Sequence, residues 1–360
     1  MFKDLSRRHF LAGSTAAAGA LSLGGPAALA ADPLKVGFVY VGPVGDFGWT
    51  HGHDLGRKAI EKEFGDKVKT TFVENVAEGP DAERVIRQLA SSGNKLIFTT
   101  SFGFMNQTVK VAKQFPDVMF EHATGFKTAP NLSAYNARFY EGRAVIGTIA
   151  GHVTKTGKFG YIASFPIPEV VMGINAFILA ARKVRPDAEI KVVWVNSWYD
   201  PGKEGDATKA LIDQGCDVIT QHTDSPAPVQ TAASRGVWCF GQASDMTTFA
   251  PEHHATAILD VWDNYYVDRT RAVMDSTWQT SNVWHGMKEG MVQMAPYNER
   301  LPAAAVEAAE AVRKGIIDGS LHPFAGPIKD QSGAVKVPEG TTMSDGDLLG
   351  MDWYVEGVSA

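Results

Sequence analysis

The sequence predicts an α/β fold with two doubly wound lobes, each built on a parallel sheet and joined to the other by a hinge. Three observations lead to this prediction. Short apolar runs alternate with helical stretches along the chain, and strict alternation is typical of parallel strands with right-handed crossovers. A second series of the same kind begins at "KFGYIASF". The length of 360 residues is sufficient for two domains.

The first series predicts one lobe. The continuous apolar run "LKVGFVYVG" indicates a strand covered on both faces, and a helix is expected from about His53 to Phe64. "VKTTFVENV" and "KLIFTTS" indicate strands on either side of the helix "GPDAERVIRQLASSG", which has Asp81 near its start and Gly93 just past its end. The helix "NQTVKVAKQFPD", the strand "VMFEHATG" and the helix "EGRAVIGTIAGHVTKTG" continue the alternation.

The second series predicts the other lobe. Its strands are "KFGYIASF", "EIKVVWVNSW", "CDVITQHT" and "VWCFGQAS", and its helices are "VVMGINAFILAARKVRP", "DATKALIDQG" and "APVQTAASRG". From residue 253 onward we expect helices and a short hairpin turned by glycine, which complete both lobes by crossing between them. The expected first lobe is therefore residues 31–137 plus about 263–320. The expected second lobe is residues 138–262 plus about 321–360.

The first thirty residues predict an export signal rather than part of the fold. Arg7 and Arg8 form a twin-arginine signature, an Ala/Gly/Leu-rich run follows, and Ala28-Leu29-Ala30 is an A-x-A cleavage site. The run contains Pro26 and has no charged stop after it, which favours cleavage over membrane anchoring. Because no cysteine lies at the cleavage site, we expect a soluble periplasmic protein without a lipid anchor.

Charge and cysteine content exclude two other classes of protein. The formal net charge of the whole chain is −6, and residues 1–30 contribute +2 of it, which leaves about −8 after cleavage. There is no basic stripe with interleaved aromatic residues, so no nucleic-acid partner is expected. Cys216 and Cys239 are the only cysteines, too few for a disulfide scaffold. Both are expected to be buried and unpaired.

Ligands of open parallel sheets bind at the carboxyl ends of the strands, and aromatic residues are frequent in the corresponding loops. They are Trp49, Phe102, Phe104, Phe165, Trp198 and Tyr199. A flat ligand between two aromatic faces gains about 1–3 kcal/mol per face. Phe104 and Phe165 are explained at least as well by packing in the core of their own lobes. Trp49 and Trp198 have Gly, Thr, Ser and Tyr as neighbours, which favours ligand contact, and Phe102 is a further candidate.

Three aspartates, Asp46, Asp224 and Asp245, are candidates for selecting the ring by accepting hydrogen bonds from its N–H groups. Each is also explained as a helix N-cap or turn residue, most easily Asp46 and least easily Asp245.

Enzyme motifs are absent from the sequence. It has no P-loop, no G-x-S-x-G and no G-x-G-x-x-G after the first strand. His51 and His53 have the wrong spacing for one helix face, and His253 and His254 are adjacent, so a metal site would need ligands from distant loops. We therefore expect a binding protein with no catalytic residues, metal ion or cofactor.

The same loops resemble a known family. The stretches "GDFGWTHGHDLGRKA", "SFGFMNQTVKVAKQFPDVMF", "YEGRAVIGTIAGHVTKTGKFGYIAS", "NSWYDPGKEGDATKALIDQGCDVITQ" and "GQASD" are similar to the basic membrane protein (PnrA-like) family of ABC-transporter substrate-binding proteins, over essentially the whole mature chain. Characterised members bind purine nucleosides, related bases or flavins. The resemblance implies the type I periplasmic binding protein fold, a small heterocyclic ligand, an ABC permease partner in the inner membrane and a monomer.

The resemblance also assigns residues. Trp49 stands seven residues before Gly56, where the family has a base-stacking phenylalanine, and Trp198 resembles the second stacking aromatic residue. Asp245 matches the last acid of the family's Gly-x-Asp-x-Asp segment, whereas Ala243 replaces the first acid.

One departure from the family concerns the ribose. Nucleoside-binding members have an aspartate for the ribose hydroxyls at the position of Tyr40. The resemblance therefore implies a free purine base, with adenine first, held in a cleft that closes by hinge motion. Alternatives are a nucleoside, a flavin precursor or an amide-bearing metabolite. From other classes, the chain is compatible with a nucleoside hydrolase that uses Asp46 or Asp224 as base, or with a ligand-sensing partner of a membrane receptor.

Overall fold

The computed structural model describes residues 32–360. The twin-arginine signature and the cleavage site expected in residues 1–30 lie outside this range. Residues Pro33–Ala360 form one compact unit. Within the described part of the chain, no helix is long and apolar enough to cross a membrane.

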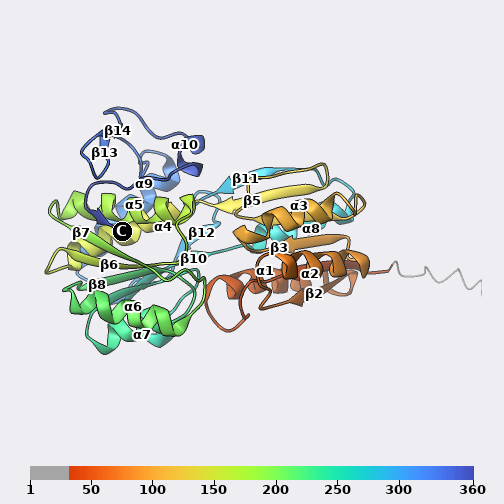
Figure 1. Ribbon diagram of the computed structural model, residues 1–360, viewed down its shortest axis with the longest axis horizontal. Helices are drawn as coiled ribbons and strands as arrows, with labels where there is room; N and C mark the ends of the chain where they lie inside the picture. The colour runs from red at the N-terminus through yellow and green to blue at the C-terminus, as the bar shows by residue number, and fades with distance from the viewer. Residues whose placement is uncertain (1–31) are drawn as a thin grey trace, which may run out of the picture. The chain divides into compact units, whose positions relative to one another are not determined.

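The first lobe is built on a six-stranded sheet with strand order β11-β5-β4-β3-β1-β2, in which all neighbouring strands are parallel. Its strands are β1 (Leu34–Val39), β2 (Val68–Val73), β3 (Leu96–Thr99), β4 (Met119–Ala123), β5 (Leu132–Ala137) and β11 (Asn282–His285). Its helices are α1 (Gly48–Phe64), α2 (Pro80–Ser91), α3 (Met105–Ala112), α8 (Asp263–Met274) and the 3-10 turns η1 (Gly65–Lys67) and η2 (Phe102–Phe104). Helix α1 packs with α8, and α2 packs with α3 (Figure 1).

The second lobe is built on a seven-stranded sheet with strand order β12-β10-β9-β8-β6-β7-β15. Its strands are β6 (Lys158–Ala163), β7 (Glu189–Trp194), β8 (Val218–His222), β9 (Trp238–Gly241), β10 (His254–Asp260), β12 (Val292–Met294) and β15 (Val358–Ser359). Its helices are α4 (Phe139–Val153), α5 (Pro168–Val184), α6 (Pro201–Asp213), α7 (Ala227–Ser234), α9 (Ala303–Asp318) and the turn η3 (Thr247–Phe249). A hairpin of β13 (Ile328–Lys329) and β14 (Val335–Val337) and the short helix α10 (Asp345–Leu349) follow.

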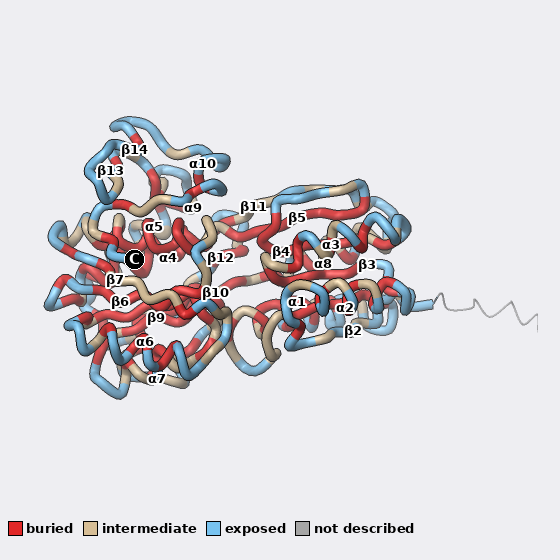
Figure 2. Tube along the Cα trace, viewed as in Figure 1, coloured by how far each residue is buried: buried red, intermediate tan, exposed pale blue. Residues whose placement is uncertain are grey.

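Both lobes have the predicted doubly wound topology. The order β2-β1-β3-β4-β5 recurs in the second sheet as β7-β6-β8-β9-β10, with helices on both faces of each sheet. Side chains of α2 and α3 form one hydrophobic core with one face of the first sheet, and a larger core contains residues of α1, α4, α5 and α8. In Figure 2 the strands of both sheets are largely buried, and the outer faces of the helices are exposed.

The chain crosses between the two sheets three times, after β5, after β10 and after β11. The expected assignment of residues up to about 320 to the first lobe needs correction for residues 292–318. β12 pairs antiparallel with β10, and α9 packs on α4. Helix α9 belongs to the second lobe because its apolar residues Ala305, Ala309 and Ile316 are buried there.

Three local expectations differ from the structure. The strands β5 and β10 precede the first two crossings, and neither was expected from the sequence; residues 254–260 were expected within a helical region. Helix α1 begins at Gly48 rather than at about His53, so that Trp49 lies in its first turn. Gly48 has φ +79, and a Cβ there would lie 2.8 Å from the backbone oxygen of Asp224 in the second lobe. Only glycine combines this conformation with such a close approach.

Candidate functional site

The two lobes enclose a cavity at the carboxyl ends of their strands, which we call the inner cavity. The first lobe contributes Val41, Trp49, Ser101, Phe102 and Thr124, and the second contributes Glu169, Trp198, His222, Asp224 and Gln242. The cavity volume is about 30 Å³, room for about two water molecules, so the lobes nearly close this space and a larger ligand enters only when they part. Four residues that the sequence singled out, Trp49, Phe102, Trp198 and Asp224, therefore meet in one place.

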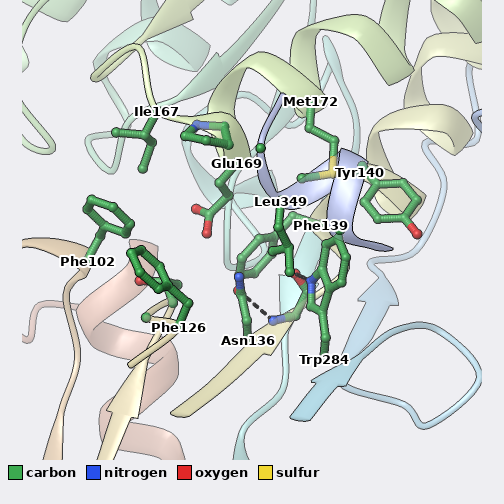
Figure 3. A pocket seen from close by; sticks show the side chains of 16 residues that line it. Phe102, Phe126, Asn136, Phe139, Tyr140, Ile167, Glu169, Met172, Trp284 and Leu349 are labelled. Carbon is green, nitrogen blue, oxygen red and sulfur yellow. Dashed lines mark hydrogen bonds between the residues drawn. The ribbon is translucent and has the colours of Figure 1, made fainter. Parts of the chain in front are cut away.

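A larger space, the outer cavity, adjoins the inner cavity and shares Phe102, Thr124 and Glu169 with it. Its volume is about 400 Å³, within the range of small-molecule pockets. Aromatic and aliphatic side chains line most of it, with Tyr140 and Trp284 on one side and the carboxyl group of Glu169 pointing into the space (Figure 3). The two cavities are chambers of one cleft, and Glu169 belongs to the wall of both.

Trp49 is held rigidly in the first-lobe wall of the inner cavity. Its ring makes edge contacts with His53, Trp262 and Phe139 at centroid distances of 4.4, 5.5 and 5.9 Å. The indole Nε1 donates a hydrogen bond of 2.7 Å to the backbone oxygen of Thr100. Because neighbours fix both the ring and its polar edge, the indole presents a defined surface to the cavity.

Trp198 is held more loosely in the second-lobe wall. It lies in the loop between β7 and α6, half-buried, and its one aromatic contact among the described residues is Phe165, with centroids 5.2 Å apart. Its Nε1 is buried and has no hydrogen-bond partner within residues 32–360. A ligand can therefore use both its ring face and its N–H group.

Backbone N–H groups at the start of α1 reach across the cleft. The N–H of Gly48 donates to Ser244 Oγ at 2.7 Å, and the N–H of Trp49 donates to Asp224 Oδ1 at 3.3 Å. These donors belong to the first turn of a helix and have no acceptor within it. Burial, reinforced by the nearby carboxyl group of Glu204, raises the pKa of Asp224 well above its usual value. The two lobes are therefore in contact at the rim of the inner cavity.

The structure does not bring three of the predicted site residues to either cavity. Asp46 is exposed. Asp245 is also exposed and accepts hydrogen bonds from the N–H and hydroxyl groups of Thr247, at 2.9 and 2.6 Å. These bonds make Asp245 a turn-stabilising residue. Tyr40 is fully buried in the first lobe, and its hydroxyl donates to Asp54 Oδ1 at 3.4 Å. The expectation that these residues surround the ligand is corrected accordingly.

Of the other aromatic residues expected near the strand ends, Phe104 and Phe165 pack against neighbouring side chains, and Tyr199 is exposed. Phe104 is fully buried in the core formed with α2 and α3, which is the alternative that the sequence left open for it. Phe165 packs against Trp198, and Tyr199 is exposed.

Cys216 and Cys239 are both buried and unpaired. Among residues 32–360, no group of three His, Cys, Asp or Glu side chains is arranged to hold a metal ion.

Sequence analysis missed polar residues in and behind the second-lobe wall: Glu169, His222 and Gln242 line the inner cavity, whereas Arg143 and Asp260 line neither cavity. Arg143 on α4 is fully buried and donates to the backbone oxygen of Gln221 at 2.8 Å and to the side chain of Gln242. Glu169 lies in the first turn of α5, two residues beyond the loop "ASFPI", so its position after β6 was a usable signal. Asp260 ends β10, and because that strand was not expected, nothing in the sequence singled out Asp260.

Two of the missed acids, Glu169 and Asp260, are mostly buried, and neither forms an ion pair with an arginine or lysine among the described residues. Both carboxylate oxygens of Asp260 and Glu169 Oε2 lack a hydrogen-bond partner in the described part of the chain. Burial raises the pKa of Glu169 to about 8, against the side chains of Asn136 and Arg143, which lower it. Burial also raises the pKa of Asp260 to about 8. Burial therefore favours the neutral form of both groups, and Glu169, which lines both cavities, offers a ligand a hydroxyl donor as well as an acceptor.

Two doubly wound lobes around a shared cleft define a fold class, that of the type I periplasmic binding proteins. Solved structures with this fold include an ABC transporter solute-binding protein from Aeropyrum pernix K1, with a TM-score of 0.70 and 19% identity over 82% of this chain and 94% of that chain. A solute-binding protein from Conexibacter woesei has a TM-score of 0.64 and 19% identity over 80% and 98% of the two chains. The likeness to these structures confirms the predicted fold.

Sequence comparison identifies the family within this class. Residues 34–321 match the family described as ABC transporter substrate-binding protein PnrA-like, and the chain belongs to this family. A protein from Brucella abortus named purine-binding protein is 60% identical over 334 residues, which cover 93% of this chain and 95% of the relative. TsgA13 of Haloferax volcanii, named as a glucose-binding protein, is 37% identical over 84% and 76% of the two chains. Membership implies a small-molecule ligand and an ABC permease as partner.

Proposed function

We propose that this chain is the periplasmic substrate-binding protein of an ABC importer and that it binds a purine base, adenine first, between its lobes. The observation that carries the proposal is that Trp49 and Trp198, from opposite lobes, line the same inner cavity. Two indole faces suit a flat heterocycle better than a sugar, which needs several hydrogen-bonding groups for its hydroxyls. The purine named for the relative from Brucella abortus, at 60% identity, agrees with this choice.

A free base is preferred over a nucleoside because Tyr40 supplies no carboxylate for a ribose. Its side chain is buried in the first lobe, where its hydroxyl bonds to Asp54. One observation favours a nucleoside as the second candidate: the outer cavity adjoins the inner one and has room for a sugar. The residues that line it are mostly apolar, with only Thr124, Asn136 and Glu169 as polar side chains beside the hydroxyl of Tyr140.

In the proposed cycle, the ligand shifts the lobes toward a closed form that the permease receives. A ligand drives closure only if it binds the closed form more tightly than the open form. Contact with Trp49 and Trp198 at once is available only when the lobes are together, and it supplies that difference. The contacts of Gly48 and Trp49 with Ser244 and Asp224 then stabilise the closed rim. Export by the twin-arginine signal would place this monomer in the periplasm.

The proposal is tested by titrating the mature protein with adenine and with adenosine while following tryptophan fluorescence. We expect adenine to quench the fluorescence, with adenosine binding at least tenfold more weakly, about 1.4 kcal/mol. Mass spectrometry of the ligand that co-purifies with the protein gives an independent reading. Absence of a response to any purine, together with a different co-purified ligand, would overturn the proposal.

A hydrolase is the competing activity, and it has a separate test. Asp46 is exposed and Asp224 accepts the N–H of Trp49, so neither is arranged as a free base beside a bound nucleoside. We expect the protein incubated with adenosine to release no adenine detectable by chromatography.

A further inference from the structure

Glu169 occupies a position that no other acid of the cleft shares, because it lines both the inner and the outer cavity. Its carboxyl group points into the space near Phe102 and Phe126, as Figure 3 shows. The side chain is 14% exposed. Its Oε2 atom is buried and has no hydrogen-bond partner in residues 32–360. A ligand satisfies this atom when the lobes part and uncover it.

No cation near Glu169 neutralises it. The terminal nitrogens of Arg143 are engaged with Thr220, Gln221 and Gln242. His222 Nε2 lies 3.6 Å from Glu169 Oε1, but burial and the charge of Arg143 lower the pKa of His222 well below its ordinary value. This histidine is therefore neutral at neutral pH and cannot form an ion pair.

Some groups around Glu169 lower its pKa, and others raise it. Asn136 on β5, Arg143 on α4 and the N-terminus of α5 all favour the ionised form. Asp260 at the end of β10 is a second buried acid, and the two carboxyl groups raise each other's pKa if ionised. Desolvation exceeds the favourable effects, because a buried carboxylate without a cation is strongly unfavourable.

The protonation state decides what the group can recognise. An ionised carboxylate offers only acceptors, whereas a carboxylic acid offers one donor and one acceptor side by side. Adenine has the complementary pair on its edge, a ring nitrogen that accepts and an exocyclic amino group that donates. Against a carboxylate, that ring nitrogen would face a second lone pair and remain unsatisfied, which is unfavourable when it is buried.

We propose that Glu169 is the specificity-determining residue of the inner cavity and that it pairs, as the neutral carboxylic acid, with the amidine edge of a 6-aminopurine. This inference rests on the proposed function, since it names the recognition chemistry of the same site. Trp49 and Trp198 stack on the two faces of the ring, and Glu169 forms hydrogen bonds with its edge. The neutral acid explains how a site with several carboxyl groups and the single buried cation Arg143 accepts an uncharged base.

The test compares Glu169→Gln with Glu169→Ala, using adenine and unsubstituted purine as probes. Glutamine is neutral and keeps one donor and one acceptor, so it mimics the protonated acid, whereas alanine removes both. We expect wild-type protein to prefer adenine over purine by about tenfold or more. Glu169→Gln is expected to keep this ratio within about threefold, and Glu169→Ala to bring it close to one. Circular dichroism and thermal unfolding show whether each variant is folded.

A pH titration gives a second readout that a merely structural role would not produce. Wild-type affinity for adenine is expected to be constant at pH values well below about 8 and to fall as pH rises past it, because Glu169 loses its proton there. In Glu169→Gln the fall is expected to disappear. Asp260→Asn serves as the matched control, since Asp260 titrates in the same range and its substitution is expected to leave the fall in place.

Three outcomes would overturn the inference alone. They are adenine binding by Glu169→Gln as weak as by Glu169→Ala, an unchanged preference for adenine in Glu169→Ala, and a pH-dependent fall that persists in Glu169→Gln. Each presupposes that wild-type protein binds adenine. Failure of the wild type to bind any purine would instead overturn the proposed function, and this inference with it.

Discussion

The two walls of the inner cavity are built differently although each presents a tryptophan. In the first lobe, Trp49 lies in the first turn of α1, contacts three aromatic rings and donates its N–H to Thr100. In the second lobe, Trp198 lies in a loop, with Phe165 as its aromatic neighbour and its N–H unpartnered among the described residues. The first wall is preorganised, and the second can adapt to what enters.

This difference suits a binding protein that closes on its ligand. A preorganised surface does not lose rotamer freedom when the ligand binds, so the open first lobe can capture the ring at little cost. The second tryptophan gains its contacts when the lobes meet, and those contacts make the closed form the tighter one. Substitutions of Trp49 and Trp198 test this division between a fixed and an adaptable wall, and substitutions of Asp260, Asp46 and Asp245 test the acids around the cleft.

Trp49→Ala is expected to have the largest effect. Adenine affinity should fall well over tenfold, and the free energy of unfolding should fall by roughly 2–3 kcal/mol, because the ring packs on His53, Trp262 and Phe139. Fluorescence titration and denaturant unfolding measure the two quantities. Trp49→Phe keeps an aromatic face and is the control. Loss of affinity without loss of stability would show that the first wall is not part of the core.

Trp198→Ala is expected to reduce adenine affinity by about tenfold, or 1.4 kcal/mol, while changing the free energy of unfolding by less than about 1 kcal/mol. The reason is that Trp198 is half-buried in a loop. Trp198→Phe should restore most of the affinity. The same two measurements apply. Equal destabilisation by Trp198→Ala and Trp49→Ala would contradict the distinction between the walls.

Asp260→Asn is expected to stabilise the ligand-free protein in a pH-dependent way. Burial raises the pKa of Asp260 to about 8 from its ordinary value of 3.8. The folded state therefore binds more protons than the unfolded state between these values, and wild-type stability falls as pH rises through this window. Asp260→Asn does not lose stability in this way. The difference in melting temperature between the variant and the wild type should therefore increase from pH 5 to pH 8. A constant difference would show that Asp260 is ionised in the folded protein.

Asp46→Ala and Asp245→Ala are expected to have the smallest effects. Both side chains are exposed and line neither cavity, and Asp245 serves the turn at Thr247. Adenine affinity should change less than about twofold in either variant, and melting temperature should change only slightly for Asp245→Ala. A tenfold loss of affinity in Asp245→Ala would show that the rim acids reach the ligand in a conformation other than the one described here.

The features that the sequence predicted correctly depend on local pattern. β1, β3 and β6 are short apolar runs that precede helices, and their periodicity is recognisable without any partner strand. Trp49 and Trp198 were selected because bulky apolar residues among glycine, threonine and serine at strand ends have no local packing role. Asp224 was selected by the same position. These inferences require only the order of residues in the chain.

The features that the sequence did not reveal depend on packing between distant segments. β5 buries Ser133 and Asn136, and β10 buries His254 and Thr256, so polar residues interrupt the apolar pattern that marks a buried strand. Their partners come from other parts of the chain: Ser133 accepts from Arg269, and Thr256 donates to Ala295. Both strands lead into a crossing between the lobes, where residues from distant parts of the chain form hydrogen bonds with their polar side chains.

The order of apolar and polar residues alone determined that the chain has two doubly wound lobes and that an aromatic residue from each faces the cleft. Tertiary structure alone decided which acids belong to the site. Asp46, Asp245 and Glu169 are similar residues near loop ends, but the first two are exposed and line neither cavity, whereas Glu169 is mostly buried and lines both. A carboxyl group acquires its protonation and its hydrogen-bonding character from its surroundings, and only the folded chain supplies those surroundings.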